Sequence, residues 1–450
     1  MIKTPHIIAQ QPCACPTGNT VSFILLCICI ASPSLADVPP PPPPGSVVVP
    51  IIETVRSDDT RETISQRTGC RWTRLARFNT WPKTFKLKAG LSVRVPSDCV
   101  PPKSSPKIQG FEPCQWQRKQ VNHTILKSTL DRLGFKPPAQ FRALIVKTTL
   151  GPKRQNIASQ RIFDYDRRSY SLKWNPASTV KIFSAAAAAE RLEMLGVSSR
   201  AKITFHYDRK TVTRSVRGLF HDALHRSDNV AHNQLVEVAG FRLLNGPQGT
   251  MGRLGLSDTQ IMRAYAISSW KKLGRRSSLR QSPKLSILGS DGKRIELLAA
   301  RDDNAYPCRK AACTTPSDLA KMMCKTVLHE QLPPESRLRL SADPSKENSL
   351  LSLFRQCLFS QCGGRYRRRP SSITSLRNRY FHEDQDYYIY RKAGYSLGWR
   401  SENIVIEDLK LKEFWTITIA AHGGKNGRVA RKILDPAVDY IARIISEGWL

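Results

Sequence analysis

An apolar pattern over residues 180–195 marks the centre of the chain, where an alanine run and spaced aliphatic residues follow the segment NPASTVK. Alanine is the strongest helix former, and apolar residues on most sides of a helix indicate burial. The pattern therefore predicts a buried helix with Ser178 at its start. Lys181 follows one turn later, on the same face.

Several other segments have the patterns of strands or of an amphipathic helix. Two of them predict a hairpin, one predicts a loop that runs into a helix, and two predict strands, the second followed by a terminal helix. In chain order these segments are RALIVKTT (142–149), QRIFDYDRR (160–168), HRSDNVAHNQLVEVAG (225–240), YYIYRKAGYSLGW (387–399) and FWTITIAA (414–421). The mixture predicts one large α/β domain over residues 115–450.

The first residues have the pattern of an export signal. Residues 21–31 are apolar, too short to cross a membrane but long enough for the core of a signal peptide, and S-L-A at 34–36 is a plausible cleavage site. We therefore expect a signal peptide over 1–36 and a periplasmic or secreted, cell-wall-associated protein. Because only Lys3 is charged in the region before the apolar core, an uncleaved anchor or a misassigned start codon are the alternatives.

Cysteine usage agrees with export. Eight cysteines remain after the predicted signal, an even number that permits up to four disulfides in an oxidising compartment. Cys308 and Cys313, and Cys357 and Cys362, are close enough in sequence to join local loops. The full pairing stays open. No cysteines have zinc-finger spacing, so we expect no structural metal, and no cofactor is implied.

The net charge of the chain limits the classes of binding partner that are expected. Lys and Arg number 71 against 36 Asp and Glu, which gives a net charge of +35 and favours polyanionic partners. Nucleic acid, an anionic membrane surface and the bacterial envelope all fit, but export disfavours nucleic acid. The basic run RYRRRP at 365–370 is either a solvated loop or an anchor to an anionic polymer.

A small module precedes the large domain. Prolines 39–44 form a stiff spacer over 37–46, and a Pro- and Ser-containing linker covers 98–114. Between them, residues 47–97 predict a strand–helix–helix–strand order. The module resembles the lysin motif (LysM), which implies binding to the glycan chains of peptidoglycan; an ordinary small αβ domain is the alternative. The resemblance rests on Asp58/Thr60/Ile64, Leu75/Asn79 and Leu87/Gly90/Pro96.

The predicted central helix also carries a candidate nucleophile. A serine hydroxyl reacts only when a neighbouring base takes its proton, and a lysine three residues on can do so if burial keeps its amine neutral. The S-x-x-K pattern alone is weak, because it recurs at Ser104, Ser268, Ser269 and Ser290. Here it is followed by Ser227-Asp228-Asn229 and by Lys392-Ala393-Gly394, in strand-like surroundings.

The order S-x-x-K, S-D-N, K-x-G resembles the active-site triplet of penicillin-binding proteins (serine DD-peptidases) and class A β-lactamases. The stretch TTPSDLAKMM at 314–323 is similar to a segment of the class A enzymes as well. The resemblance implies an antiparallel five-stranded sheet flanked by helices, with a helical subdomain.

The same resemblance implies a role for each motif residue. Ser178 attacks the carbonyl, and Lys181 helps to remove the proton of the Ser178 hydroxyl. Ser227 relays a proton to the leaving nitrogen, and Lys392 lies beside Ser227. Asn229 binds the substrate amide, and Asp228 has a structural role. The backbone N–H groups of Ser178 and Tyr395 hold the oxyanion, Ala393 and Gly394 line the substrate site, and Arg400 is a further carboxylate-binding candidate.

Two departures from the family pattern bear on the reaction. Class A β-lactamases use a glutamate to activate the deacylating water, but a forward alignment places Ala266 there, and Glu296 lies beyond an insertion over 266–300. Ala393 also replaces the usual hydroxyl residue of K-T-G. The favoured function is therefore a peptidase or transferase of peptidoglycan stem peptides that penicillins acylate. A β-lactamase that hydrolyses β-lactams, and a non-catalytic wall-binding protein, are the alternatives.

Overall fold

The computed structural model describes residues 51–55, 59–68, 72–82, 85–89, 91–95, 112–341, 349–359, 387–396, 398–409, 411–423 and 428–450. The predicted signal peptide, the proline spacer, most of the linker and the basic run at 365–370 lie outside these residues. The chain divides into two units, Met1–Ser104 and Ser105–Leu450, and each is described by itself.

The first unit has the strand–helix–helix–strand order expected from the sequence: β1 (Ile51–Thr54), α1 (Arg61–Thr68), α2 (Trp72–Phe78) and β2 (Ser92–Val95). β1 and β2 pair in antiparallel fashion. Its small core consists of Val55, Ile64, Leu75 and Val93. Asp58, Gly90 and Pro96 of the lysin-motif pattern lie outside the described residues, so this resemblance stays a prediction.

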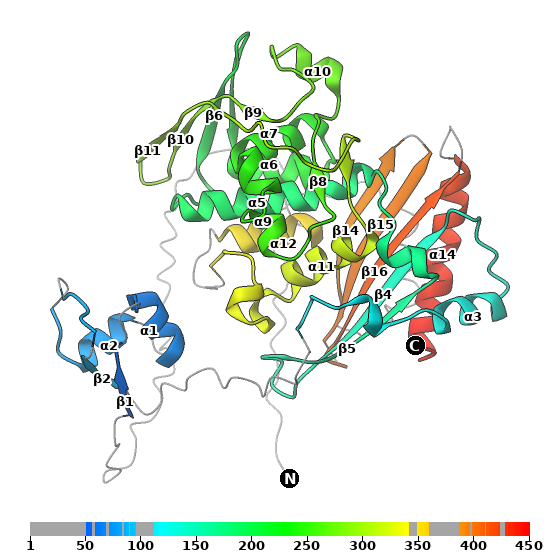
Figure 1. Ribbon diagram of the computed structural model, residues 1–450, viewed down its shortest axis with the longest axis horizontal. Helices are drawn as coiled ribbons and strands as arrows, with labels where there is room; N and C mark the ends of the chain where they lie inside the picture. Colours follow the sequence, from blue (N-terminus) through cyan, green and yellow to red (C-terminus); the bar gives the residue numbers. More distant parts are fainter. Residues whose placement is uncertain are drawn as a thin grey trace, which may run out of the picture. The chain divides into compact units, whose positions relative to one another are not determined.

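The second unit is built on a mixed sheet of strand order β14-β15-β16-β4-β5-β3 (Figure 1). The bounds are β14 Tyr387–Ser396, β15 Trp399–Asp408, β16 Glu413–His422, β4 Arg142–Leu150, β5 Ile157–Asp164 and β3 Val121–Asn122. The hairpin predicted at 142–168 is confirmed, with Ile145 opposite Phe163. The expectation of five antiparallel strands is wrong by one. β3 adds a sixth, and it runs parallel to β5.

Alternation along the strands sends side chains into two cores, one on each face of the sheet. Ile145 and Ile417 pack with α14 (Arg428–Ser446) and α3 (Ile125–Arg132). Leu144 and Val146 face the opposite core, which α5 (Lys181–Met194) and α11 (Pro316–Val327) also enter. Figure 1 shows α14 and α3 on one side of the sheet and α11 on the other. The sheet is thus buried on both faces.

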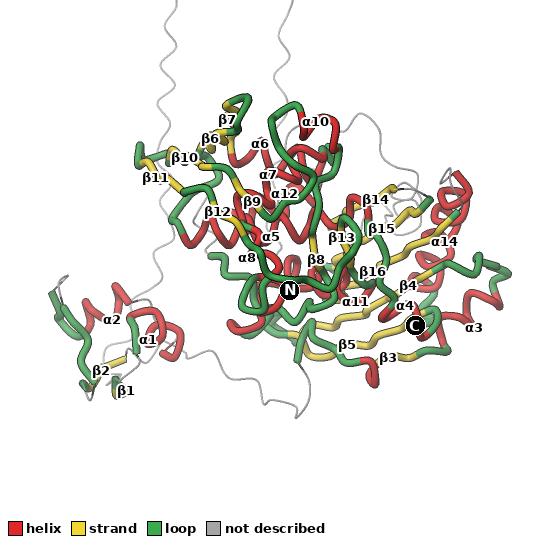
Figure 2. The backbone as a smooth tube through the Cα atoms, turned by 45° about the horizontal axis from the view of Figure 1, so that its top comes forward, coloured by secondary structure: helices red, strands yellow, loops and turns green. Residues whose placement is uncertain are grey.

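A helical subdomain covers one end of this sheet, and α5 and α7 pack side by side in it. Its helices, besides α5, are α6 Val216–Phe220, α7 Asn229–Ala239, α8 Phe241–Asn245, α9 Thr250–Arg253 and α12 Leu350–Phe359. The insertion over 266–300 is folded. Its strands β10 (Lys284–Leu288) and β11 (Arg294–Leu297) extend the hairpin of β6 (Lys202–His206) and β7 (Thr211–Ser215) into a four-stranded sheet (Figure 2).

The remaining elements are short and connect these parts. They are α4 Arg167–Ser171, α10 Ile267–Lys271, β8 Gln260–Ile261, β9 Gln281–Ser282, β12 Ala300–Arg301, β13 Ala312–Cys313, and the single turns η1 Arg118–Gln120, η2 Ala177–Val180, η3 His221–His225, η4 His329–Gln331 and η5 Pro334–Ser336. β9 pairs with β12, and β8 pairs with β13.

Disulfides join both near and distant parts of the second unit. Cys308 and Cys313 form the local bridge that their spacing indicated. Cys114 bonds to Cys324 across 210 residues and ties the start of the unit to α11. Cys357 is also disulfide-bonded, while Cys362 lies outside the described residues. In the part of the chain that the structure describes, no helix has the length and apolar character of a membrane span.

Candidate active site

Ser178 lies in the turn η2, directly before α5, where the sequence predicted it. The residue before it, Ala177, has a left-handed backbone with φ of 52°. A side chain strains that conformation, and such strain is often found at functional sites. α5 is buried along most of its length, and Lys181 at its first position is fully buried. The start of a helix also supplies positive potential at this point.

Lys181 reaches across to the segment that carries Ser227. Its Nζ donates to the backbone carbonyl of Ser227, to Ser227 Oγ at 3.3 Å and to Asn229 Oδ1 at 2.7 Å. All three acceptors are uncharged. The buried amine therefore has hydrogen bonds but, in the part of the chain that the structure describes, no directly bonded carboxylate.

Lys392 approaches the same hydroxyl from the sheet. It is buried on β14, and its Nζ donates to Ser227 Oγ at 2.9 Å. Ser227 thus lies between two lysines that come from positions 211 residues apart. The backbone of Ser227 has φ of 59°, a second strained position at the site.

Burial makes both lysines weak bases. Desolvation lowers the pKa of Lys181 to about 7, although the charge of Asp228 opposes the shift. Desolvation also lowers the pKa of Lys392 well below its usual range, and the charges of Lys181 and Arg391 add to the effect. A substantial fraction of Lys181 is therefore neutral near pH 7, as a base for Ser178 has to be.

Asp228 is structural, as expected. Its carboxylate accepts from the backbone N–H of Ala231 at 2.7 Å and so caps α7, which fixes the loop that presents Ser227 and Asn229. The predicted site residues Ser178, Lys181, Ser227, Asn229 and Lys392 are thus brought together from two helix starts and one strand.

Gly394 lets β14 pass close to the turn that holds Ser178. A Cβ at this position would lie 2.6 Å from the carbonyl oxygen of Pro176 and 3.0 Å from the backbone nitrogen of Thr179. Ser401, opposite Gly394 on β15, donates to the same carbonyl at 3.3 Å. The glycine thereby sets the distance between Ser178 and the Ala393–Tyr395 backbone.

We expect Gly394→Ala to slow acylation of Ser178 by about a hundredfold, because the added methyl pushes β14 away from η2 and misplaces the reacting groups. The rate of penicillin adduct formation measures this. Gly292→Ala is the control, since its left-handed φ of 80° is strained but open space surrounds it. That variant is expected to lose stability and keep the acylation rate. Equal rates for Gly394→Ala and the wild type would contradict the role of the close approach.

Ser178, Ser227 and Lys392 line one pocket of about 510 Å³. Ala393, Gly394 and Tyr395 form its strand wall, as the sequence predicted. Arg400 lines it too, with its guanidinium 4.6 Å from the ring centroid of Tyr395. Its Nε is buried and has no hydrogen-bond partner among the described residues, so this donor is available to an anionic ligand. The other lining residues are Leu224, His225, Cys357, Leu358, Arg391, Ser401 and Glu402.

The forward alignment placed Ala266 where class A enzymes have their glutamate. In the structure, the residue that contacts the turn of Ser178 is Tyr265, one position earlier. Asn233 pairs with both backbone groups of Tyr265, at 2.9 Å each, and the Tyr265 hydroxyl donates to the carbonyl of Ala177 at 3.2 Å. Glu296 lies on β11, bonded to Ser286 and Arg294, and does not line the pocket. Neither position therefore supplies a carboxylate to Ser178.

Among the described residues, the one carboxylate that lines the pocket is Glu402, and it is paired with an arginine. It accepts from Arg391 through both oxygens, at 2.7 and 2.6 Å. This pair was missed from the sequence, because it depends on the register of β14 against β15.

The histidines near the S-D-N segment separate into two kinds. His232 is buried and bonds to Ser184 at 2.8 Å, a packing role. His225 stacks on His221 with ring centroids 5.0 Å apart and lines the pocket, and burial lowers its pKa. The only feature of the sequence that could have predicted His225 in the pocket is its position two residues before Ser227.

A serine at the start of a buried helix, with two lysines joined through a second serine, is the arrangement of a serine acyl-transfer site. The model of the beta-lactamase enzyme family matches residues 163–435, more than half of the chain. The chain belongs to the beta-lactamase enzyme family.

Similar solved structures share little sequence with the chain. A β-lactamase from Sphaerobacter thermophilus DSM 20745 is 14% identical, with 72% of this chain and 97% of that chain covered and a TM-score of 0.43. A mutant of PBP-A, in an acyl-enzyme complex with penicillin-G, is 11% identical over 74% and 100%, with a TM-score of 0.44. A β-lactamase from Francisella tularensis is 16% identical over 72% and 97%, with a TM-score of 0.42. The comparison with curated proteins gives no match.

Proposed function

We propose that the protein is an exported serine acyl-enzyme that cleaves or transfers peptidoglycan stem peptides at a D-Ala-D-Ala-like bond, and that penicillins acylate it. The observation that carries the proposal is the position of Ser227 Oγ between two buried lysines, with Lys181 one turn after Ser178. A relay of this kind serves a reaction in which one proton leaves a nucleophile and another reaches a leaving nitrogen.

The first step forms the acyl-enzyme. Neutral Lys181 takes the proton of the Ser178 hydroxyl, and the oxygen attacks the substrate carbonyl carbon. The negative charge that develops on the carbonyl oxygen is held by the backbone N–H groups of Ser178 and Tyr395. Ser227 passes its proton to the leaving nitrogen as the amide bond breaks and takes one from the protonated Lys181, which becomes neutral again. The acyl group remains on Ser178 until water or an acceptor amine removes it.

Recognition of the substrate falls to the opposite wall of the pocket. Arg400 supplies positive charge for the terminal carboxylate of a stem peptide or for the carboxylate of a penicillin, and Lys392 offers a hydrogen bond to the same group. Ala393 offers no hydroxyl there, so Arg400 takes a larger share of this contact. Asn229 is available for the amide of the acyl side chain.

Slow removal of the acyl group favours a peptidase over a β-lactamase. Among the described residues that line the pocket, no free carboxylate can activate a water beside Ser178, because Glu402 is paired with Arg391, and residue 265 is a tyrosine. Burial raises the pKa of Tyr265 above its usual range, so the phenol stays neutral and is no base at physiological pH. The second candidate, a β-lactamase, is favoured by the family match. The third, a non-catalytic wall-binding protein, is disfavoured by the lowered pKa of Lys181.

The test of the proposed function is release of D-alanine from a diacylated Lys-D-Ala-D-Ala peptide. We expect the wild-type protein to release one D-alanine per peptide cleaved, and Ser178→Ala to release none. Hydrolysis of benzylpenicillin is followed beside it, and is expected to stop after about one turnover. Steady hydrolysis of the penicillin with no release of D-alanine would establish the β-lactamase instead.

Replacing Tyr265 tests why deacylation is slow. The contacts with Asn233 involve only main-chain atoms of residue 265, so they can survive a change of side chain. We expect Tyr265→Glu to shorten the life of the penicillin adduct by about a hundredfold, because the carboxylate can act as a general base for water. Tyr265→Phe keeps the ring and adds no base, and its adduct is expected to last as long as that of the wild type. A time course by intact-mass spectrometry measures both, and an unchanged life in Tyr265→Glu contradicts the argument.

We also propose that the first unit and the surplus of positive charge hold the enzyme to the cell wall. The lysin-motif resemblance of residues 47–97 supports the first part, and the net charge of +35 supports the second. On this proposal the protein is periplasmic or secreted, and its signal peptide is removed.

A further inference from the structure

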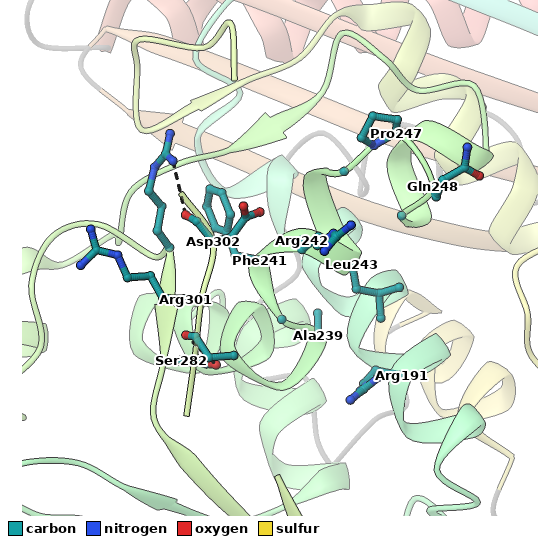
Figure 3. Close-up of a pocket in the computed structure, with 15 residues that line it drawn as sticks. Arg191, Ala239, Phe241, Arg242, Leu243, Pro247, Gln248, Ser282, Arg301 and Asp302 are labelled. Carbon is teal, nitrogen blue, oxygen red and sulfur yellow. Dashed lines mark hydrogen bonds between the residues drawn. The ribbon is translucent and has the colours of Figure 1, made fainter. Parts of the chain in front are cut away.

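A second hollow, of about 610 Å³, lies in the large unit away from the pocket of Ser178, and the two share no lining residue. Its walls come from the end of α5, from α8 with the residues around it, and from the strands β9 and β12 (Figure 3). β9 and β12 belong to the 266–300 insertion and its edge. The insertion therefore forms one wall of a second cavity.

The hollow carries a surplus of positive charge. Four arginines line it: Arg191, Arg242, Arg280 and Arg301. Among the described lining residues the one carboxylate is Asp302, which already accepts from the Tyr306 hydroxyl at 2.7 Å and from the Asn304 amide at 2.6 Å. Among the described residues, neither Arg191 nor Arg242 forms an ion pair with a carboxylate. Arg301 pairs with Asp303 at 2.7 Å, so the positive charge that the described residues do not neutralise here is chiefly that of Arg191 and Arg242.

One wall of the hollow is held in place. Arg280 donates to the backbone carbonyls of Asp302 and Asn304, at 3.3 and 2.5 Å, and its guanidinium lies 5.7 Å from the ring centroid of Phe241. Phe241 itself is buried. A cation fixed by hydrogen bonds and by an aromatic ring loses little freedom when an anion binds beside it.

The spread of the arginines indicates the shape of the ligand. In Figure 3, Arg301 and Arg191 lie on opposite sides of the hollow, with Arg242 between them. The volume of about 610 Å³ is typical of pockets for small organic ligands, so it admits a ligand larger than a single phosphate ion. Guanidinium groups bind phosphate through paired hydrogen bonds, and a phosphate offers several charged oxygens to groups that approach from different directions.

We propose that this second hollow binds an elongated ligand that carries at least two phosphate groups, with Arg191 and Arg242 as its main contacts. Such a ligand is either a soluble oligophosphate or a segment of a phosphate-bearing polymer. The inference does not depend on the proposed function, because none of the residues of the Ser178 pocket take part. Ser178→Ala is accordingly expected to bind phosphate ligands as the wild type does.

Calorimetric titration of the purified protein with tripolyphosphate tests the proposal. We expect saturable binding near one ligand per chain, tighter than that of inorganic phosphate, and a loss of about tenfold or more in the double variant Arg191→Ala/Arg242→Ala. The control is Arg209→Ala/Arg217→Ala, which removes the same charge from exposed positions outside the hollow and is expected to change the affinity by less than about twofold.

A parallel titration with poly(glycerol phosphate) separates the two sources of ligand. Binding of both probes, lost together in Arg191→Ala/Arg242→Ala, indicates a polymer segment; binding of tripolyphosphate alone indicates a soluble oligophosphate. Equal losses in the two double variants would mean that only the net charge matters, and would overturn the proposal. So would the lack of saturable binding to either probe.

Discussion

Incubation with benzylpenicillin is expected to add the mass of one penicillin to the wild-type protein, and to add nothing to Ser178→Ala. The loss in the variant should be complete, because no other hydroxyl among the described residues of the pocket has a buried lysine one helical turn after it. Intact-mass spectrometry of both proteins measures the adduct, and peptide mapping locates it on the segment that contains Ser178.

The chain offers a matched control for this experiment. Ser290 also belongs to an S-x-x-K pattern, with Lys293, but it lies at an exposed turn, where its hydroxyl contacts that of Ser198 at 3.1 Å. Ser290→Ala is expected to form the adduct as the wild type does. An adduct that persists in Ser178→Ala would show that another residue reacts, and a wild type without an adduct at any penicillin concentration would remove the acyl-enzyme proposal.

Acylation of the wild type is expected to accelerate as the pH rises through about 7, and to level off above it. Lys181 acts as a base only when neutral, and burial lowers its pKa from 10.5 to about 7, so the protonated, inactive form dominates below that pH. Lys181→Met removes the base while it keeps an unbranched side chain. We expect this variant to acylate about 10²–10⁴ times more slowly and without the rise near pH 7.

Lys325 serves as the control for burial itself. It is also a buried lysine, and desolvation lowers its pKa to about 8, but its Nζ donates to the carbonyl of Ser336, whereas that of Lys181 donates to Ser227 and Asn229. Lys325→Met is expected to change thermal stability and to leave the pH profile of acylation intact. The profile is measured on the folded fraction from about pH 5 to about pH 9. A flat profile in the wild type would contradict the role of Lys181 as the base.

The parts of the site that the sequence predicted are those set by local pattern. The alanine-rich run fixed the position of α5 and therefore of Ser178 and Lys181 on one face. The loop before α7 was predictable because Asp228 is a strong helix cap. The strand of Lys392 was recognisable from its apolar and aromatic residues. What joined these three segments in one prediction was the resemblance to a family, since spacing alone left S-x-x-K ambiguous.

The parts that were missed depend on contacts between distant segments. Tyr265 is held by Asn233, 32 residues earlier, and an alignment across the insertion placed the neighbouring Ala266 there instead. The parallel strand β3 has two residues, too few to produce a pattern. The bridge between Cys114 and Cys324 closes a loop of 210 residues, and eight cysteines allow many other pairings.

Three residues at the site have left-handed backbones. Ala177 precedes the nucleophile, Ser227 carries the relay hydroxyl, and Ala266 follows Tyr265. Glycine would adopt each conformation at lower cost, by about 1 kcal/mol per position. If the chain had ceased to react, selection for stability alone would favour glycine at the two alanines. Related sequences that have lost Ser178 can therefore be compared with those that keep it, at positions 177 and 266. We expect glycine or asparagine to appear at positions 177 and 266 in those lineages first.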